Sequence, residues 1–371
     1  MRIAWVDYPY SAQGGDTLGY ANLIGHLRPA LARAGVTFVR ERSLLGETIA
    51  LHVCSPGVFG QTDEAKPWVR ARGRGVRNVL LTMWESRDAI VGQRGNEMVN
   101  CARADLIVTP NGWCSELFGT RTRRPVATVP LACNPIPYRA RTMPVGGFTA
   151  ARPFTWLLVG AFNPRKGIPQ LAGVWQDYFA TNTAMRLLIK STFPVDVLAR
   201  LEETGEAPVV VTRANDPRCP VNMVQDSRLV QRAELEAMYD DADAFVLPTM
   251  GEGWSLPTQE AMTAGLPVLA TACQGINEYA DPSNAALMPW TWQAIGSRSQ
   301  AMRSDAPDGK FRYCYVQPTT LAAAMIEVMI DYEAALARAK KAAWDARHFT
   351  WERTAGALIA AIGQHALMAA A

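Results

Sequence analysis

Residues 244–271 carry the pattern that most restricts how this chain folds. Residues 244–247 are a short apolar run, typical of a buried strand, and a loop that contains proline and glycine ends it. Residues 256–264 are good helix formers, with a proline in the first turn and a glycine directly after them. A second strand is predicted at 267–271. The loop 251–255 should therefore lie at the carboxyl end of a strand and at the start of a helix.

The loop 251–255, with the sequence GEGWS, is expected to bind phosphate. A loop that leads into a helix presents unpaired backbone N–H groups and the positive end of the helix dipole. Glu252 and Glu260 flank this position, and carboxylates accept hydrogen bonds from sugar hydroxyls. A nucleotide sugar, with hydroxyls on both sides of its phosphates, fits the arrangement. The alternative is an ordinary buried turn with solvated glutamates.

Residues 252–268, EGWSLPTQEAMTAGLPV, resemble the donor-site signature of retaining GT-B glycosyltransferases of family 4. The family pattern is E-G-[FW]-[GS]-L-P-x-x-E-A-M-A-x-G-x-P-V, and Thr263 stands where alanine is usual. The resemblance implies that Glu252 contacts the transferred sugar and that Glu260 holds the nucleotide ribose. It also implies phosphate contacts from the backbone amides of Gly253, Trp254, Ser255 and Leu256.

Strands and helices alternate along most of the chain, which favours parallel sheets with crossover helices. The segment 134–153 is rich in proline and glycine, has no period and is predicted to be a linker. The pattern restarts at residue 154, and the Ala-rich residues 327–343 are expected to form one long helix. Strands in the first half are predicted at 2–7, 37–39, 49–53, 79–83, 106–108 and 126–129.

The resemblance implies an α/β protein of GT-B architecture, with two Rossmann-like domains that face each other across a cleft. Residues 1–145 would bind the acceptor, and residues 152–345 would bind the nucleotide sugar. The segment 348–352, HFTWE, corresponds to the family's F-S-W-E, where the last helix crosses back to the first domain. Residues 350–371 are therefore assigned to this crossover helix, with Thr350 as its predicted N-cap.

A second phosphate-binding element is predicted at residues 160–167, GAFNPRKG, which follow a strand and open a helix. They match the family's G-R-x-x-x-x-K-G except at Ala161, where arginine is usual. Lys166 keeps the lysine, and Arg165 or Lys190 is a candidate for the missing cation. A diphosphate leaving group requires positive charge where its own negative charge develops. Solvated surface cations are the alternative.

Other candidates lie outside these two elements. Gly14 and Gly15 follow the first strand, where the family places a glycine-containing loop that faces the donor; a plain turn is the alternative. Glu85 ends a strand where many relatives carry a His-Asp pair, and it is a candidate to position or deprotonate an acceptor hydroxyl. A helix-capping or surface carboxylate is the alternative for Glu85. Arg228 and Leu229 correspond to positions where relatives contact the nucleobase.

Two further motifs are expected to be structural. His52 lies in an apolar strand and is predicted to be a hydrogen-bonded core residue. Asp241 and Asp243 match the short D-x-D metal pattern of another glycosyltransferase fold, but they stand where a helix runs into a buried strand. No metal and no cofactor are expected, and the nucleotide-diphosphate sugar is a co-substrate. The seven cysteines are scattered without a CxxC, so a reducing cytoplasm is expected.

The charge of the chain is unevenly distributed. Residues 1–145 hold 18 Lys or Arg and 11 Asp or Glu, while the remainder holds 19 and 23. A basic first half fits an acidic acceptor or an anionic membrane surface, and a solvated face is the alternative. The chain shows neither a signal peptide nor an apolar run of spanning length. We expect a cytoplasmic protein, with peripheral contact at the inner membrane face left open.

Together these features predict a retaining glycosyltransferase that uses a UDP- or GDP-linked sugar and a hydroxyl acceptor on a glycan, a lipid-linked molecule or another compound. Its role would be glycan, glycolipid or polysaccharide synthesis, with Glu252, Lys166 and Glu85 as catalytic candidates. Because Ala161 replaces an arginine, a nucleotide-sugar-binding protein without transferase activity is an alternative. A GT-B epimerase or phosphorylase, and a transferase that acts on a polyanion such as modified nucleic acid, also remain alternatives.

Overall fold

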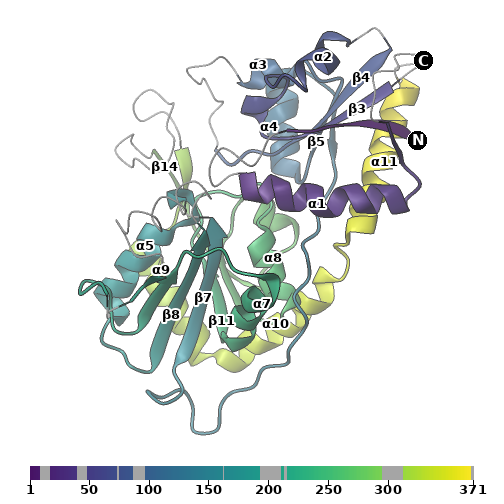
Figure 1. The fold of residues 1–371 in the computed structure, drawn as a ribbon. Helices are drawn as coiled ribbons and strands as arrows, with labels where there is room; N and C mark the ends of the chain where they lie inside the picture. The colour runs from purple at the N-terminus through teal and green to yellow at the C-terminus, as the bar shows by residue number, and fades with distance from the viewer. Residues whose placement is uncertain are drawn as a thin grey trace.

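The computed structural model describes residues 1–8, 17–39, 48–72, 75–86, 97–161, 163–192, 210–212, 215–294 and 312–368. Gly14 and Gly15 lie outside the described residues. Within them the chain forms two large sheets with helices packed on their faces, one in each domain, and a small two-stranded sheet (Figure 1). No helix in this described part is long and apolar enough to cross a membrane.

The first domain is built on a sheet whose strands pair in parallel in the order β2-β1-β3-β4-β5-β6. Alternate residues of each strand point to opposite faces. Leu51 and Leu81 therefore share a core with helix α1 (Thr17–Arg33), whereas Ala50 and Leu80 share a second core with helix α4 (Gly112–Thr122). The strands are β1 (Arg2–Val6), β2 (Thr37–Val39), β3 (Thr48–Val53), β4 (Val76–Leu81), β5 (Leu106–Thr109) and β6 (Val126–Thr128). Two short helices, α2 (Lys66–Arg70) and α3 (Glu97–Cys101), complete this domain.

The second domain is built on a sheet in the order β13-β12-β11-β7-β8-β10-β9, in which β9 runs antiparallel to β10. Its strands are β7 (Phe154–Ala161), β8 (Met185–Thr192), β9 (Val210–Val211), β10 (Met223–Asp226), β11 (Ala244–Leu247), β12 (Val268–Thr271) and β13 (Ala286–Met288). Its helices are α5 (Ile168–Val174), α7 (Arg232–Asp241), α8 (Leu256–Thr263), α9 (Pro318–Ile330) and α10 (Tyr332–Ala346). Helix α5 packs against α9 and α8 against α10, and Figure 1 shows these two pairs on either side of the strands.

The order of the central strands fixes where a ligand fits. Strand β7 continues through α5 to β8 on one side, while β11 continues through α8 to β12 on the other. From β7 the next strand is added on one side of the sheet, and from β11 the next strand is added on the other side. In open α/β sheets, such a switch point opens a crevice at the carboxyl ends of the strands. The loops that follow β7 and β11 therefore meet at this crevice.

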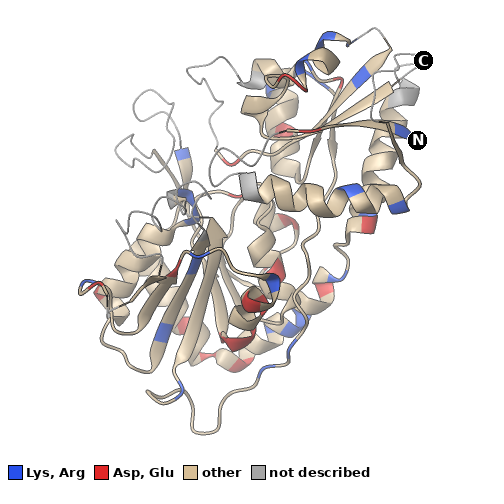
Figure 2. Cartoon of the chain, viewed as in Figure 1, with Lys and Arg blue, Asp and Glu red and all other residues tan. Residues whose placement is uncertain are grey.

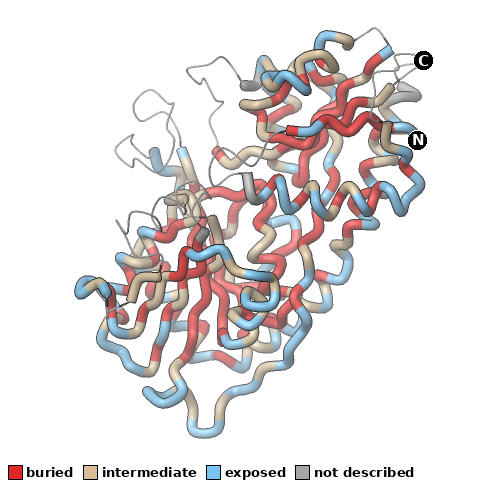
Figure 3. Tube along the Cα trace, viewed as in Figure 1, coloured by how far each residue is buried: buried red, intermediate tan, exposed pale blue. Residues whose placement is uncertain are grey.

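A small antiparallel ribbon, β14 (Thr291–Ala294) with β15 (Arg312–Tyr315), lies beside the loop after β11. The backbone N–H of Cys314 donates to the carbonyl of Met250 at 2.9 Å. This bond ties the ribbon to the start of the Gly251–Ser255 loop. Burial follows the sheets: Figure 3 shows the central strands of both domains as buried, with exposed residues on the outer helices and turns.

The chain crosses between the domains twice. The first crossing, the irregular segment 129–153, is fixed to the second domain, because Arg141 donates to the carbonyls of Tyr239, Ala242 and Ala264. At the second crossing, the hydroxyl of Thr350 accepts from the N–H of Arg353 in the first turn of α11 (Trp351–Met368), as expected for its N-cap.

Helix α11 returns to the first domain, as the sequence predicts (Figure 1). It packs against α1, where Trp351 stacks on His26 with ring centroids 5.6 Å apart. Arg33 of α1 pairs with Glu352 at 2.7 Å.

The prediction of one helix over residues 327–343 is wrong. Helix α9 ends at Ile330 and α10 begins at Tyr332. The carboxylate of Asp331 between them accepts from the N–H of Ala334 at 3.3 Å and caps α10. An Ala-rich composition favours helix throughout, so it does not reveal a break that a single capping aspartate makes.

Candidate active site

Two loops bring Lys166 and Glu252 together at the switch point. Lys166 follows β7, Glu252 follows β11, and the ammonium lies 2.7 and 2.9 Å from the two carboxylate oxygens. The hydroxyl of Thr249 donates to the same carboxylate at 3.0 Å. Glu252 is 3% exposed, so this charge is buried and its partners compensate the cost of burial.

The two loops pack so closely that one position requires glycine. Gly167 has φ +75°, and a Cβ there would lie 2.1 Å from the carbonyl oxygen of Pro248. Only glycine adopts this conformation freely and leaves room for the neighbouring backbone. Gly167, which ends the 160–167 motif, therefore allows the two loops to pack closely enough for Lys166 to contact Glu252.

Arg165 joins this pair to the first domain. Its guanidinium donates to the carbonyl of Gly251, lies 3.8 Å from the Glu252 carboxylate and lies 3.6 Å from the carboxylate of Glu85. The side chain of Arg165 is 11% exposed. Lys166, Glu252, Arg165 and Glu85 thus form one cluster of two cations and two carboxylates, which we call the four-charge cluster.

Lys190, the other candidate for the missing cation, is placed differently. Its ammonium is buried and donates to the backbone carbonyls of Ser191, Asp226 and Arg228 at 3.2, 3.4 and 2.6 Å. Burial lowers the pKa of Lys190. This lysine fastens the segment that follows β10, and its charge is directed at protein carbonyls.

The loop 251–253 touches the first domain directly. Gln274 accepts from the N–H of Glu252 and donates to the carbonyl of Glu85, both at 2.8 Å. A Cβ on Gly251 would lie 2.3 Å from that same carbonyl. Asn111, which also caps α4, donates to the carbonyl of Gly253. The two domains therefore meet around the four-charge cluster.

The start of α8 is held rigid. Trp254 is buried, and its indole N–H donates to Gln259 at 3.1 Å. The hydroxyl of Tyr279 donates to the carbonyls of Trp254 and Ser255 at 2.8 and 3.0 Å. Ser255 has φ +72°, an uncommon conformation for a residue other than glycine. Leu256 is the first residue of the helix, whose N-terminus faces the loop.

Glu260, on α8, contacts a separate group of residues. It is buried, with Arg232 3.1 Å from one carboxylate oxygen and the hydroxyl of Tyr239 3.2 Å from the other. Burial raises the pKa of Glu260 to about 6, although Arg232 and Tyr239 act in the opposite direction. Arg232 begins α7, a helix on which Figure 2 shows several acidic residues together.

Arg228 and Leu229 lie between β10 and α7. Arg228 pairs with Asp226 at 2.6 Å and with Glu234 at 2.8 Å, and Leu229 is 63% exposed. This segment is the one that Lys190 fastens. The structure therefore sorts the predicted residues into three neighbourhoods: the four-charge cluster, the Glu260 group and the Lys190–Leu229 segment.

The two motifs expected to be structural have structural partners. His52 is buried between the hydroxyl of Tyr8 at 2.7 Å and the side-chain carbonyl of Asn78 at 2.8 Å, which confirms it as a core residue. Burial lowers the pKa of His52 to about 4. Asp243 pairs with Arg152 at 2.7 Å and accepts from the N–H of Thr155. Among the described residues, no group of three or more His, Cys, Asp or Glu could hold a metal ion.

The contacts that sequence reasoning missed come from Thr249, Asn111, Gln274 and Arg232. A weak signal exists for Asn111, because Pro110-Asn111-Gly112 ends a strand and opens a helix. The positive φ of Gln274, +47°, marks a tight turn after β12, but its sequence position carries no such signal.

Comparisons with known proteins bear on the fold and on the second domain. Residues 153–296 match the family model described as "Glycosyl transferases group 1". No curated protein sequence matches the chain. A solved sucrose-phosphate synthase from Thermosynechococcus elongatus is 16% identical, with a TM-score of 0.61 and 100% of both chains covered.

Two other similar structures are longer proteins. TarM from S. aureus, solved in complex with Fondaparinux, alpha-GlcNAc-glycerol and UDP, is 13% identical, with a TM-score of 0.54 and coverage of 85% of this chain and 55% of that one. The pneumococcal O-GlcNAc transferase GtfA, solved with UDP and GlcNAc, is 12% identical, with a TM-score of 0.55 and coverage of 91% and 59%. This chain thus spans a little over half the length of these two. It has the GT-B fold, and its residues 153–296 are similar to the glycosyl transferases group 1 family.

Proposed function

We propose that the chain is a retaining glycosyltransferase of family 4 that moves a sugar from a nucleotide-diphosphate sugar to an acceptor hydroxyl without a metal ion. The observation that carries the proposal is the buried Lys166–Glu252 pair at the switch point, directly before the N-terminus of α8. A cation and a helix N-terminus at one place suit a diphosphate. A buried carboxylate beside them suits the hydroxyls of the sugar.

Each member of the four-charge cluster has a role in this proposal. Lys166 and Arg165 stabilise the negative charge that develops on the leaving diphosphate. Glu252 accepts hydrogen bonds from the transferred sugar, and Glu85 positions the acceptor hydroxyl from the first domain. The bond from the anomeric carbon to the phosphate oxygen breaks, the bond to the acceptor oxygen forms on the same face, and the acceptor proton goes to the leaving phosphate. No second carboxylate is needed as a nucleophile.

Arg165 takes the place of the cation that Ala161 lacks. Its guanidinium lies 3.8 Å from Glu252, whereas the Lys190 ammonium is bound by three carbonyls. In the described structure the positive charges of Arg165 and Lys166 face Glu85 and Glu252. When a diphosphate binds, Arg165 and Lys166 would contact its oxygens as well as the carboxylates. Glu85 and Glu252 would then accept hydrogen bonds from hydroxyl groups of the substrates.

The two domains divide the work in this proposal. Residues 152–345 bind the donor, and residues 1–145 with the α11 segment 350–371 carry the acceptor, which is a glycan, a lipid-linked molecule or another hydroxyl compound. UDP is the first donor nucleotide to test, because the TarM and GtfA structures contain UDP. Glu260 is proposed to hold the ribose, and Arg228 and Leu229 to lie beside the base.

The deciding experiment is a screen of UDP- and GDP-linked sugars for hydrolysis without an acceptor, followed by acceptor trials with the best donor. We expect slow hydrolysis of one donor and faster transfer when an acceptor is present. The transferred sugar in the product should have the same anomeric configuration, α or β, as in the donor. Glu252→Gln should abolish both reactions. A product of inverted configuration would contradict the retaining mechanism.

The absence of arginine at position 161 favours one second candidate, a nucleotide-sugar-binding protein without transferase activity. The same screen separates the two. If calorimetry detects donor binding but no donor is hydrolysed or transferred with any acceptor, the binding protein is the better description.

A further inference from the structure

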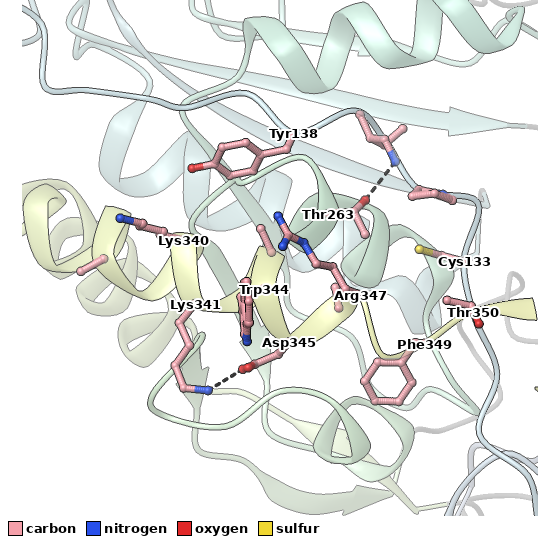
Figure 4. A pocket seen from close by; sticks show the side chains of 15 residues that line it. Cys133, Tyr138, Thr263, Lys340, Lys341, Trp344, Asp345, Arg347, Phe349 and Thr350 are labelled. Atoms are coloured by element: carbon pink, nitrogen blue, oxygen red, sulfur yellow. Dashed lines mark hydrogen bonds and ion pairs between the residues drawn. The ribbon is translucent and has the colours of Figure 1, made fainter. Parts of the chain in front are cut away.

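A large groove lies away from the four-charge cluster, at the far end of α8. It has a volume of about 930 Å³ and runs between linker residues 133–138 and helix α10 (Figure 4). We call it the α10 groove. Thr263, the last residue of α8, lies in it and accepts from the N–H of Ile136 at 2.9 Å. The α10 groove is therefore separate from the loop that we assign to the donor.

One wall of the groove is formed by α10 and by Arg347, which directly follows it. Ala337, Lys340, Lys341 and Trp344 recur at the spacing of three or four residues that places side chains on one side of a helix. The last turn of α10 adds Ala343, Asp345 and Ala346 to this wall. The opposite wall is the linker, with Tyr138 at its edge. Figure 4 shows Arg347 extending from the α10 side toward Tyr138, with Lys340 farther along the same helix.

The groove is lined by an apolar surface and by cationic side chains beside it. Buried Cys133 and Ile136 and half-buried Phe349 supply apolar surface. Trp344 and Tyr138 are 62% and 52% exposed, which is unusual for side chains of this size. Large apolar surface that remains exposed in a concave site is typical of a binding site.

The groove has three cationic residues, and one of them has an acidic partner. Lys341 pairs with Asp345 at 2.6 Å, and Asn284 also donates to that carboxylate at 3.0 Å. By contrast, within the described part of the chain no acidic side chain pairs with Lys340 or with Arg347. The guanidinium of Arg347 lies over the ring of Trp344, 4.9 Å from its centroid. Two positive charges thus stand beside an exposed aromatic surface.

We propose that the α10 groove binds an anionic amphiphile, a molecule in which a phosphate or carboxylate group is joined to an apolar body. The anionic group binds Lys340 and Arg347, and the apolar body covers Trp344, Tyr138 and the floor of the groove. Both domain crossings line the groove, through residues 133–138 and 347–350, so the occupant touches both. A soluble metabolite and a membrane lipid share this chemistry.

The test uses n-octyl phosphate below its micelle concentration as the probe, with the full chain and calorimetry. Inorganic phosphate has only the anionic group and octanol only the apolar chain, so each should bind far more weakly. The double variant Lys340→Ala/Arg347→Ala should weaken octyl phosphate binding by about tenfold or more, because two contacts to a charged group are lost. Arg338→Ala is the matched control, since Arg338 is on α10 but does not line the groove, and it should leave the Kd unchanged.

A second variant, Ala337→Trp, narrows the groove and keeps every cation. It should also weaken octyl phosphate binding, and circular dichroism will verify that each variant is folded. Binding that is equal in the wild type and the double variant would overturn the proposal.

Vesicles distinguish the sources of the ligand. Sedimentation with phosphatidylglycerol vesicles, but not with phosphatidylcholine vesicles, that is lost in the double variant would identify a lipid headgroup. Octyl phosphate binding without vesicle binding would identify a soluble molecule. If neither octyl phosphate nor phosphatidylglycerol vesicles bind the wild type, the proposal is wrong. None of these measurements depends on transferase activity.

Discussion

The four-charge cluster and the α10 groove each have two cationic side chains to which we assign ligand binding, but the surroundings of these side chains differ. Arg165 and Lys166 are largely buried and lie against carboxylates, whereas Lys340 is exposed and Arg347 rests on a tryptophan. The first arrangement fixes the positions of the charges before any ligand arrives. The second leaves the charges available. A preorganised, neutralised cluster suits chemistry, while unpaired cations at an aromatic surface suit simple binding.

The largest effect should come from Lys166→Ala. Loss of this cation should lower turnover of the donor by about 100- to 1,000-fold, the range seen when a preorganised electrostatic contact is removed. The measurement is kcat with the donor found in the screen. Arg186→Ala, which removes an exposed cation of β8, is the control and should retain full activity. Equal activity in both variants would remove Lys166 from the mechanism.

The next effect separates Arg165 from Lys190. Arg165→Ala should raise the Kd for UDP by about tenfold or more, since a charge-assisted contact is lost. Lys190→Met should instead reduce stability by about 1–3 kcal/mol, because three buried carbonyls lose their donor. UDP titration and thermal unfolding of both variants provide the answer. If the two variants exchange these phenotypes, Lys190 is the replacement cation.

A pH series tests Glu260 in two ways. Burial raises the pKa of Glu260 from 4.5 to about 6, so the folded protein binds this proton more tightly than the unfolded chain does. The contribution of Glu260 to stability therefore falls as the pH rises from 4.5 to about 6 and is constant above that, a change of about 2 kcal/mol. Thermal unfolding of the wild type and of Glu260→Gln across this range measures it.

The same series tests the ribose contact. The ionised carboxylate accepts hydrogen bonds from ribose hydroxyls, so UDP affinity should increase as the pH rises through about 6. UDP titrates in this range too, and Glu260→Gln retains that part of the pH dependence. Only the difference in UDP affinity between the wild type and Glu260→Gln measures the effect of Glu260. Identical dependence of UDP affinity on pH in the two proteins would exclude a contact between the Glu260 carboxylate and the donor.

The smallest effect should be that of Lys340→Ala on stability. An exposed lysine without an acidic partner contributes little, and we expect a change below about 0.5 kcal/mol in unfolding free energy. Chemical denaturation checks this. A clear gain in stability would indicate that Lys340 is repelled by Lys341 and Arg347, which is the strain that a bound anion would relieve.

Much of the fold could be predicted because its signals are local. Short apolar strands, glycines that end helices and the 252–268 signature are each contained in a few residues. These signals place Lys166 and Glu252 at the ends of β7 and β11. That the two side chains touch follows only from the parallel pairing of these strands, which the sequence supports through its alternation of strand and helix.

The remaining contacts depend on packing between distant segments. Gln274 reaches Glu85 across 189 positions of sequence, and Arg165 meets Glu85 only because the two domains adjoin there. The sequence favours Arg165 and Lys190 equally, since it places one in the loop after a strand and the other at the end of a strand. Burial and the carbonyls around Lys190 separate them, and neither has a sequence pattern. The α10 groove escaped prediction for the same reason, because its walls come from the linker and a helix about 200 residues later.

Helix α11 also determines the order in which the protein is completed during synthesis. Its Ala355 and Leu358 are buried in the core shared with α1 and the first sheet, yet they are translated after the whole second domain. Residues 154–346 can close their own sheet as soon as they leave the ribosome. The domain made first must wait, with an apolar face uncovered, until α11 emerges. A chain truncated before residue 351 should therefore contain a complete second domain and a first domain with an uncovered apolar face.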